Sequence, residues 1–280
     1  MRKYALLRER VERAAPFKSL ELVVPHVATD EELARAHSTE YVSRVTAGTL
    51  SPDDIRIIGF PWSPQLVHRS RRSCGATIEA CRAALEDGYS VNLAGGTHHA
   101  FFDHGEGYCV FNDSAVAARA MLAERRTQAM IVIDCDVHQG NGTAAIFAEE
   151  PFVFTFSIHG ENNYPRRKQA SDLDIGLPDG TEDEVYLEAL QQGLHEALTR
   201  VRPDLAIYLA GADSYVEDHY GRLALTKSGL RARDRLVFNE CEAKGVPVAV
   251  TMAGGYANKV EDIVDIHFQT VWEAVSRISK

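Results

Sequence analysis

The sequence lacks the features that mark membrane-spanning, secreted and nucleic-acid-binding proteins. Its apolar runs fall well short of the roughly 18–20 residues that a membrane span needs. The first ten residues contain no apolar core of a secretory signal and instead predict an amphipathic helix. A net charge of −10 argues against a nucleic-acid-binding surface, which requires a basic face. We therefore expect neither a membrane nor a nucleic acid among the partners of this protein.

Cysteine is scarce as well. The five cysteines form no C-x-x-C pair; they are Cys74, Cys81, Cys109, Cys135 and Cys241. Their odd number and scattered positions favour reduced thiols over a disulfide framework, and so a cytoplasmic location.

Linkers, internal repeats and nucleotide-binding motifs are also missing. No stretch rich in Pro, Gly and Ser divides the chain, so we predict that residues 1–280 form a single domain. The segment Gly95-Gly96-Thr97 matches neither G-x-x-x-x-G-K-S/T nor G-x-G-x-x-G, which disfavours a nucleotide site.

What the sequence does contain is an alternation of short apolar runs and segments of helical period. The predicted strands are 90–94, 130–133, 152–158, 205–210 and 246–252. The predicted helices are 64–87, 114–124, 183–201, 228–244 and 261–278. Such alternation indicates βαβ units and a mostly parallel sheet. Because four of the strands are nearly free of polar residues, we expect helices on both faces of the sheet.

The clearest chemical signal lies at the end of the second predicted strand, in the stretch 131–142, IVIDCDVHQGNG. Asp134, Asp136 and His138 occupy alternate positions there, so their side chains would face the same way in a straight strand. Carboxylate and imidazole ligands suit a divalent metal ion. The alternative is an ordinary hydrophilic turn in which these residues bind nothing.

Polar residues also follow three other predicted strands. His98 and His99 follow the first strand, Asp213 the fourth and Tyr256 the fifth. Ligands bind beyond the carboxyl ends of the strands in open parallel sheets, so we expect these side chains to meet at one edge. Two alternatives stay open, namely Asp213 as a helix N-cap and Tyr256 as a packing aromatic.

A catalytic metal site needs three protein ligands and one open position. Asp136 and His138 supply two ligands, and Asp213 is the natural third. One of the tandem histidines could then take a proton from the reacting water, and Tyr256 could donate a hydrogen bond to a developing oxyanion. Asp134, which is left over from the ligand set, could orient a histidine.

These motifs together resemble the histone deacetylase superfamily, the zinc-dependent acyl-amine hydrolases of the arginase/deacetylase fold. The matching segments are 95–100, 107–113, 134–142, 211–213 and 254–256. Gln139, Asn141 and the segment 59–63 are most similar to the class IV branch and its bacterial relatives. The resemblance implies a single three-layer α/β domain with a mostly parallel central sheet.

The resemblance also implies a role for each candidate residue. The implied zinc ligands are Asp136, His138 and Asp213. His99 would act as general base and then as general acid, and His98 would be its electrostatic partner, held by Asp134. The hydroxyl of Tyr256 would polarise the acyl carbonyl. Asn141 would support His99, the second histidine of the pair.

A substrate channel and a second ion follow from the same resemblance. The implied channel residues are Gly107, Tyr108, Tyr164, Gly254 and Gly255, with Tyr108 on one wall and Tyr164 on the other. A structural monovalent cation, usually potassium, would lie near Asp134, Ser157 and Ile158.

The chain departs from the pattern of the superfamily in two places. Asn141 stands where many members carry a second aspartate, although the class IV branch also has asparagine there. Members normally begin with a β-strand and a substrate-facing loop ahead of the helix that matches residues 2–13. We therefore expect either a true start upstream of Met1, or a sheet without its usual first strand and a pocket without part of its rim.

The leading hypothesis is a metal-dependent amidohydrolase that removes an acyl group, acetyl or longer, from a lysine side chain or a small amine. A catalytically silent module that binds acylated amines or partner proteins is an alternative on the same fold. A binuclear manganese ureohydrolase would need an extra carboxylate, which the stretch 138–141 lacks. Zinc is the implied metal, and an Asp/His/Asp site also accepts ferrous iron. The sequence leaves the acyl length, the amine and the oligomeric state open.

Overall fold

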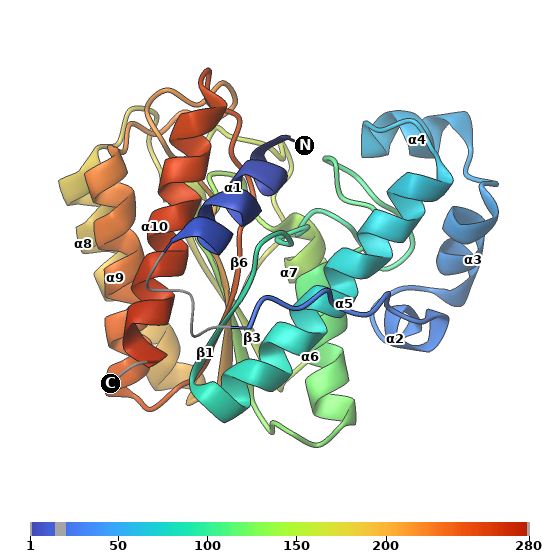
Figure 1. The fold of residues 1–280 in the computed structure, drawn as a ribbon, viewed down its shortest axis with the longest axis horizontal. Helices are drawn as coiled ribbons and strands as arrows, with labels where there is room; N and C mark the ends of the chain where they lie inside the picture. Colours follow the sequence, from blue (N-terminus) through green and yellow to red (C-terminus); the bar gives the residue numbers. More distant parts are fainter. Residues whose placement is uncertain (1, 15–20, 279–280) are drawn as a thin grey trace.

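The computed structural model describes residues 2–14 and 21–278. Its centre is a six-stranded sheet of order β1-β6-β5-β2-β3-β4, in which every neighbouring pair is parallel. The strands are β1 (Tyr89–Asn92), β2 (Met130–Asp134), β3 (Val153–Gly160), β4 (Leu173–Leu177), β5 (Leu205–Leu209) and β6 (Val248–Thr251). Helices cover both faces of the sheet (Figure 1), so the predicted three-layer α/β fold is confirmed.

The helices divide between the two faces of the sheet. One face, on the left in Figure 1, is covered by α1 (Arg2–Arg13), α8 (Asp183–Val201), α9 (Lys227–Ala243) and α10 (Val260–Ile278). The other face is covered by α5 (Pro64–Asp87), α6 (Asp113–Ala123) and α7 (Asn141–Phe147). Beyond α5 lie the short helices α2 (Asp30–Ala34), α3 (Thr39–Ala47) and α4 (Pro52–Ile58).

The hydrophobic core has two halves because strand side chains alternate between the faces of a sheet. In β2, Ile131 and Ile133 belong to the half under α8, α9 and α10, whereas Met130 and Val132 belong to the half under α5 and α6. All four side chains are at most 1% exposed. A strand that is buried on both faces needs an unbroken apolar run, which is the pattern that predicted it.

The five predicted strands are confirmed to within two residues, and the five predicted helices to within one. The N-terminal amphipathic helix is confirmed from Arg2 onward, and Met1 lies outside the described residues. The sequence does not predict β4, which is an edge strand of sequence LDIGL. Its Asp174 and Gly176 occupy the exposed positions, and both residue types are rare in strands.

The helices α2, α3, α4 and α7 are also absent from the prediction. They have between five and nine residues, which is too short for a helical period to show. Local capping defines two of them instead. Thr29 and Glu32 form a capping box at the start of α2, and Ser51 and Asp54 do the same for α4.

A buried arginine lies beneath the carboxyl ends of the strands. Arg233, on α9, is 0% exposed and pairs with Asp234 at 2.8 Å. Its Nη1 donates to the backbone carbonyl of Gly211 at 2.5 Å and to that of Cys135 at 3.4 Å. Arg233 therefore ties the segment that follows β5 to the segment that follows β2.

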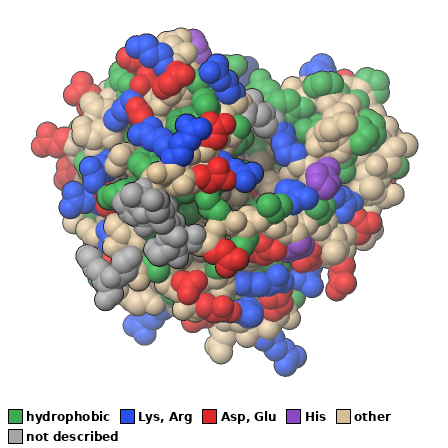
Figure 2. Space-filling view, viewed as in Figure 1, with side chains coloured by type: hydrophobic (Ala, Val, Ile, Leu, Met, Phe, Trp, Pro, Cys, Tyr) green, Lys and Arg blue, Asp and Glu red, His purple; other side chains and the backbone are tan. Residues whose placement is uncertain are grey.

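The described helices, the surface charges and the cysteines are those of an ordinary globular protein. No helix in the described part of the chain has both the length and the apolar character that crossing a membrane requires. On the face shown in Figure 2, acidic and basic side chains are interspersed. The five cysteines are free thiols, and all of them are buried.

We predict that Arg233→Met lowers the free energy of unfolding by about 3–5 kcal/mol, the usual cost of removing one partner of a buried ion pair. Asp234 would keep its buried charge, and two backbone carbonyls would lose their donor. Urea unfolding followed by circular dichroism measures the loss. The control is Arg235→Met on the exposed side of α9, with an expected change below about 0.5 kcal/mol. Equal stability of the two variants would contradict the role given to Arg233.

Candidate metal centre and active site

Four neighbouring strands deliver the predicted site residues to one edge of the sheet. The carboxyl ends of β1, β6, β5 and β2 lie side by side in that order. The loops that follow them carry, in the same order, His98 with His99, the segment 254–256, Asp213, and Asp136 with His138. Side chains from distant parts of the sequence therefore meet where ligands bind in parallel α/β sheets.

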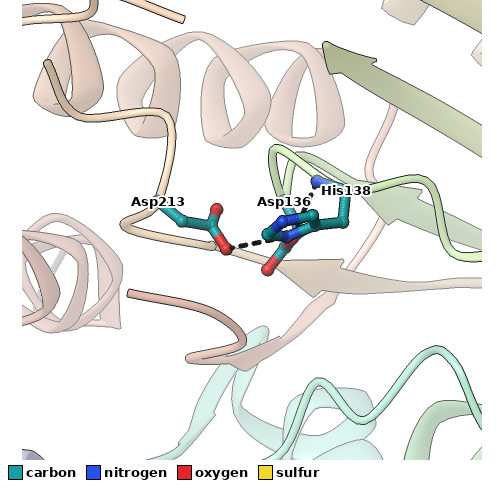
Figure 3. A group of neighbouring side chains, drawn as sticks. All are labelled: Asp136, His138 and Asp213. Carbon is teal, nitrogen blue, oxygen red and sulfur yellow. Dashed lines mark hydrogen bonds and ion pairs between the residues drawn. The ribbon is translucent and has the colours of Figure 1, made fainter. Parts of the chain in front are cut away.

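Asp136, His138 and Asp213 form a compact cluster (Figure 3). Each residue offers one ligand atom, and these atoms all lie within 4.8 Å of one another. Nδ1 of His138 is 3.0 Å from Oδ1 of Asp136 and 3.4 Å from Oδ2 of Asp213. This spacing and this donor set could hold one divalent ion with a position left open.

Backbone amides hold the two carboxylates of the cluster in place. The N–H of Gly254 donates to Oδ2 of Asp136 at 2.7 Å, and the N–H of Val137 donates to Oδ1 of Asp213 at 2.9 Å. Position 254 requires glycine because a Cβ atom there would lie 1.7 Å from Oδ2 of Asp213. The loop after β6 can therefore pass against the cluster only as bare backbone.

The cluster carries more negative charge than its single imidazole balances. Burial and the neighbouring carboxylate of Asp136 raise the pKa of Asp213 to about 7, and Oδ2 of Asp213, which lies 3.4 Å from Nδ1 of His138, accepts no hydrogen bond from the described residues. Burial by itself lowers the pKa of His138, but the two carboxylates outweigh this effect and raise that pKa to about 10. Two buried carboxylates that share one imidazole and leave an oxygen without a hydrogen bond fit a bound cation.

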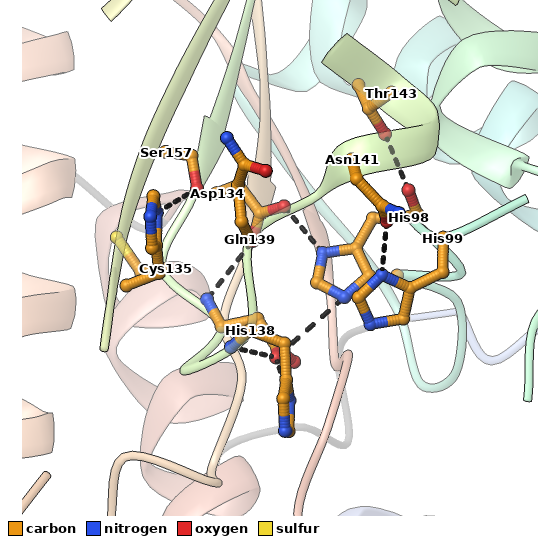
Figure 4. Close-up of polar contacts among 12 residues, drawn as sticks. His98, His99, Asp134, Cys135, His138, Gln139, Asn141, Thr143 and Ser157 are labelled. Atoms are coloured by element: carbon orange, nitrogen blue, oxygen red, sulfur yellow. Dashed lines mark hydrogen bonds and ion pairs between the residues drawn. The ribbon is translucent and has the colours of Figure 1, made fainter. Parts of the chain in front are cut away.

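The tandem histidines lie beside this cluster and have different partners (Figure 4). Nδ1 of His98 is 2.6 Å from Oδ2 of Asp134, and Nδ1 of His99 is 2.7 Å from Oδ1 of Asn141. The centres of the two imidazole rings are 4.1 Å apart. The ring of His99 also lies edge-on to the ring of His138, with 6.0 Å between their centres.

The surroundings move the pKa values of the two histidines in opposite directions. Burial lowers the pKa of His98, but the charges of Asp134 and Asp136 outweigh it and raise that pKa to about 9. Burial holds the pKa of His99 well below its usual value, and the neighbouring His98 lowers it further. These shifts favour the protonated form of His98 and the neutral form of His99, and a neutral ring can accept a proton.

Tyr256 lies on a loop that is held from two sides. Its N–H donates to Oδ2 of Asp218 at 2.6 Å. Nζ of Lys3 donates to the carbonyls of Ala253 and Gly255 at 3.3 and 3.2 Å, and it lies 5.3 Å from the centre of the Tyr256 ring. Burial raises the pKa of Tyr256, so the phenol stays protonated and can donate a hydrogen bond.

The predicted channel residues lie around the histidines and Tyr256. Tyr164 is edge-on to His99, with 4.9 Å between the ring centres. The ring centre of Tyr108 is 6.3 Å from that of Tyr256, and both Tyr108 and Tyr164 are 43% exposed. Gly107 packs on His99, where a Cβ atom would lie 2.7 Å from Cδ2 of the imidazole. The structure thus places aromatic rings between the buried histidines and the solvent.

The predicted monovalent cation site falls at the carboxyl end of β2, beside the second half of β3. Asp134 and Ser157 are partners in the register of these strands, and Ile158 is next along β3. Oδ1 of Asp134 accepts the N–H of Asp136 at 3.1 Å, and the Ser157 hydroxyl lies 3.0 Å from Nδ1 of His159. The structure brings the three predicted residues together, and the ion itself stays a prediction.

Three residues that hold the site are missing from the sequence-based prediction. Lys3 and Asp218 fix the loop of Tyr256, and Glu106 accepts hydrogen bonds from Asn141 and Tyr164. Lys3 and Asp218 stand in no motif, because charged residues on helices and loops are usually solvated. For Glu106 a signal existed, since it is the residue directly before the Gly107-Tyr108 motif.

Fold and site together define a three-layer α/β protein with a carboxylate–histidine cluster and a histidine pair at one edge of a parallel sheet. The family model described as histone deacetylase domain matches residues 1–271. An uncharacterized protein of Picosynechococcus sp. is 43% identical over 267 residues, which is 95% of this chain and 89% of that protein. The chain therefore belongs to the histone deacetylase family and is a hydrolase that acts on amide bonds.

Other relatives and solved structures agree. The histone deacetylase-like amidohydrolase of Pseudomonas aeruginosa is 31% identical over 252 residues, covering 82% of this chain and 64% of its own length. The HDA15 HD domain superposes with a TM-score of 0.81 at 22% identity, covering 97% of this chain and 82% of that one. An HDAC homologue complexed with SAHA gives a TM-score of 0.82 at 22% identity, with 98% and 77% covered. At this identity the two structures show the shared fold.

We predict that chelator-treated protein binds one Zn²⁺ per chain and gains about 2.7 kcal/mol of stability when free Zn²⁺ is about one hundred times Kd. Asp213→Asn should abolish this gain, because a neutral amide is a weaker ligand. In this variant the amide oxygen at position 213 can still accept the N–H of Val137. The repulsion between the carboxylates of positions 136 and 213 is removed. The unloaded variant should therefore be at least as stable as the unloaded native protein.

Elemental analysis and thermal unfolding, with and without Zn²⁺, measure both effects. The control is Asp87→Asn, exposed at the end of α5, which should bind Zn²⁺ as the native protein does. The same Zn²⁺-induced stabilisation in Asp213→Asn as in Asp87→Asn would remove Asp213 from the ligand set.

Proposed function

We propose that this protein is a metal-dependent deacylase. It would hydrolyse the amide bond between an acyl group, acetyl or longer, and the amine of a lysine side chain or of a small molecule. Zinc is the proposed ion at Asp136, His138 and Asp213, and ferrous iron suits the same ligands. The observation that carries the proposal is the pair of histidines beside this cluster, of which His98 contacts the carboxylate of Asp134 and His99 contacts the amide of Asn141.

His99 is the proposed proton carrier. When bound, a divalent ion polarises the acyl carbonyl and the attacking water. His99 takes the proton of that water at Nε2, because its Nδ1 is engaged with Asn141. The water oxygen bonds to the carbonyl carbon, the C–N bond breaks, and His99 returns the proton to the departing amine. The products are a carboxylate and a free amine.

His98 is the proposed electrostatic partner. Asp134 holds its ring and helps to keep it protonated, so a fixed positive charge lies next to His99. A fixed charge in a buried site stabilises the negative charge that develops on the substrate oxygen. It also keeps the neighbouring His99 neutral until that ring accepts a proton.

Tyr256 is the proposed hydrogen-bond donor to the carbonyl oxygen as negative charge builds up there. Its protonated phenol suits this role, and Lys3 and Asp218 fix the backbone around it. The substrate would enter between Tyr108 and Tyr164, whose rings can pack against the methylene groups of an extended amine.

Two further expectations belong to the same proposal. One is a structural potassium ion beside Asp134, Ser157 and Ile158. The other is a cytoplasmic location, which the five free cysteines support because reduced thiols persist in that compartment.

We predict that Tyr256→Phe lowers kcat by about 10²–10³, the usual cost of one lost oxyanion donor, with a smaller change in KM. The aromatic ring and its packing are kept, so any decrease in kcat is due to the missing hydroxyl. The control is Tyr89→Phe at the opposite, amino end of β1, which should keep native kcat. Steady-state kinetics on an acyl-lysine substrate measure the effect. Near-native turnover by Tyr256→Phe would exclude this role for the hydroxyl.

The activity itself is tested with fluorogenic acetyl-lysine and long-chain acyl-lysine peptides, together with acetylated small amines. We expect release of free amine that a chelator stops and added Zn²⁺ restores. The preferred acyl length and amine then define the substrate. One bound ion without turnover on the whole panel would favour the silent binding module. Two ions per chain would favour the ureohydrolase.

A further inference from the structure

Glu106 joins two parts of the site that the mechanism treats separately. It lies on the loop after His99, and its carbonyl accepts the N–H of Cys109 at 2.8 Å. One carboxylate oxygen, Oε1, accepts two hydrogen bonds. The amide Nδ2 of Asn141 donates at 2.6 Å, and the hydroxyl of Tyr164 donates at 2.7 Å. Glu106 therefore contacts both the partner of the proposed base and one wall of the channel.

The contact with Glu106 decides which way the amide of Asn141 faces. The NH₂ group of an amide only donates and its oxygen only accepts, whereas a carboxylate oxygen accepts. The NH₂ group of Asn141 therefore faces Glu106, and its oxygen faces Nδ1 of His99 at 2.7 Å. A hydrogen bond between these two atoms needs the proton on Nδ1. The neutral ring of His99 then carries its lone pair on Nε2.

Asparagine alone would not enforce this tautomer. An amide turned by half a rotation would offer its NH₂ group to Nδ1, and His99 would then have to carry its proton on Nε2. An aspartate at position 141 would have two accepting oxygens and would need no help. With asparagine there, the orientation has to come from a residue further out. Glu106 is in contact with the amide and has the right chemistry.

We propose that Glu106 is a positioning residue, which orients the amide of Asn141 and so keeps His99 in the tautomer whose Nε2 accepts a proton. The catalytic consequence rests on the proposed function, whereas the tautomer does not. The same oxygen holds Tyr164, whose ring is edge-on to His99 at 4.9 Å. Burial and the bond to Glu106 raise the pKa of Tyr164, so its hydroxyl stays a donor.

The first test is Glu106→Gln, which keeps the shape of the side chain but adds a donor. The glutamine NH₂ group can donate to the oxygen of Asn141, and the amide can then turn. We expect His99 to move from the Nδ1-protonated to the Nε2-protonated tautomer, read by ¹H–¹⁵N correlation spectra of histidine-labelled protein. We expect kcat to fall about 10–100-fold, as for other partners that orient site residues, with little change in KM.

The matched control is Glu149→Gln, an exposed glutamate just after α7. This variant loses the same charge and should keep both the native His99 spectrum and the native kcat. A change common to both variants would mean that net charge, and not the contact with Asn141, is responsible.

The second test is the double variant Glu106→Gln with Asn141→Asp. An aspartate only accepts, so it restores the Nδ1-protonated ring without Glu106, and we expect most of the lost kcat to return. Asn141→Asp alone places two carboxylates in contact and should lower kcat. We thus expect each single substitution to lower kcat and the double variant to have nearly the native kcat. If Glu106 only held its loop in place, the losses of kcat in the two single variants would add up in the double variant.

The two readouts separate this inference from the proposed function. An unchanged Nδ1-protonated His99 in Glu106→Gln overturns the inference, whatever the protein hydrolyses. A changed tautomer in a protein that turns over no acylated amine supports the inference and counts against the deacylase. Failure of the double variant to restore the Nδ1-protonated ring would also overturn it.

Discussion

The burial of three carboxylates at one edge of the sheet is the constraint on which the rest of the structure depends. Asp134, Asp136 and Asp213 are at most 3% exposed. A buried charge that nothing compensates costs several kcal/mol, so each carboxylate needs donors. The N–H of Gly254 serves Asp136, and the N–H of Val137 serves Asp213. Because each of these donors lies in the loop of a different strand, the contacts that balance the charge also assemble the site.

The two loops that carry Asp136 and Asp213 also contain buried backbone carbonyls that need hydrogen-bond donors, and Arg233 supplies them. The buried guanidinium donates to the backbone carbonyls of Cys135 and Gly211. Asp234 balances the charge of Arg233 from the same helix. A buried ion pair is seldom the most stabilising choice for a core. Here it fixes the two strand ends that carry Asp136 and Asp213, so positional accuracy explains it better than stability does.

The sequence predicts those parts of the molecule whose signal is local. Buried strands and long helices show their period in the chain, and polar residues after an apolar strand mark the edge where ligands bind. The edge strand β4 and the short helices are set by pairing and by caps, so they have no comparable period. Lys3 and Glu106 show the same limit at the site. Their partners are Gly255 and Asn141, and although Glu106 stands next to the Gly107-Tyr108 motif, no pattern in the chain records which distant residue either side chain contacts.

The closeness of His98 and His99 explains why one ring has a carboxylate partner and the other an amide partner. The centres of the two buried rings are 4.1 Å apart, so two adjacent positive charges there would repel each other. The aspartate beside His98 and the amide beside His99 separate the two rings into one charged and one neutral imidazole. An amide beside His99 adds no charge, but it does not fix its own orientation. Its C=O and NH₂ groups have nearly the same shape, and one accepts a hydrogen bond where the other donates. The carboxylate of Glu106 supplies that direction from one residue further out, through its contact with the NH₂ group of Asn141.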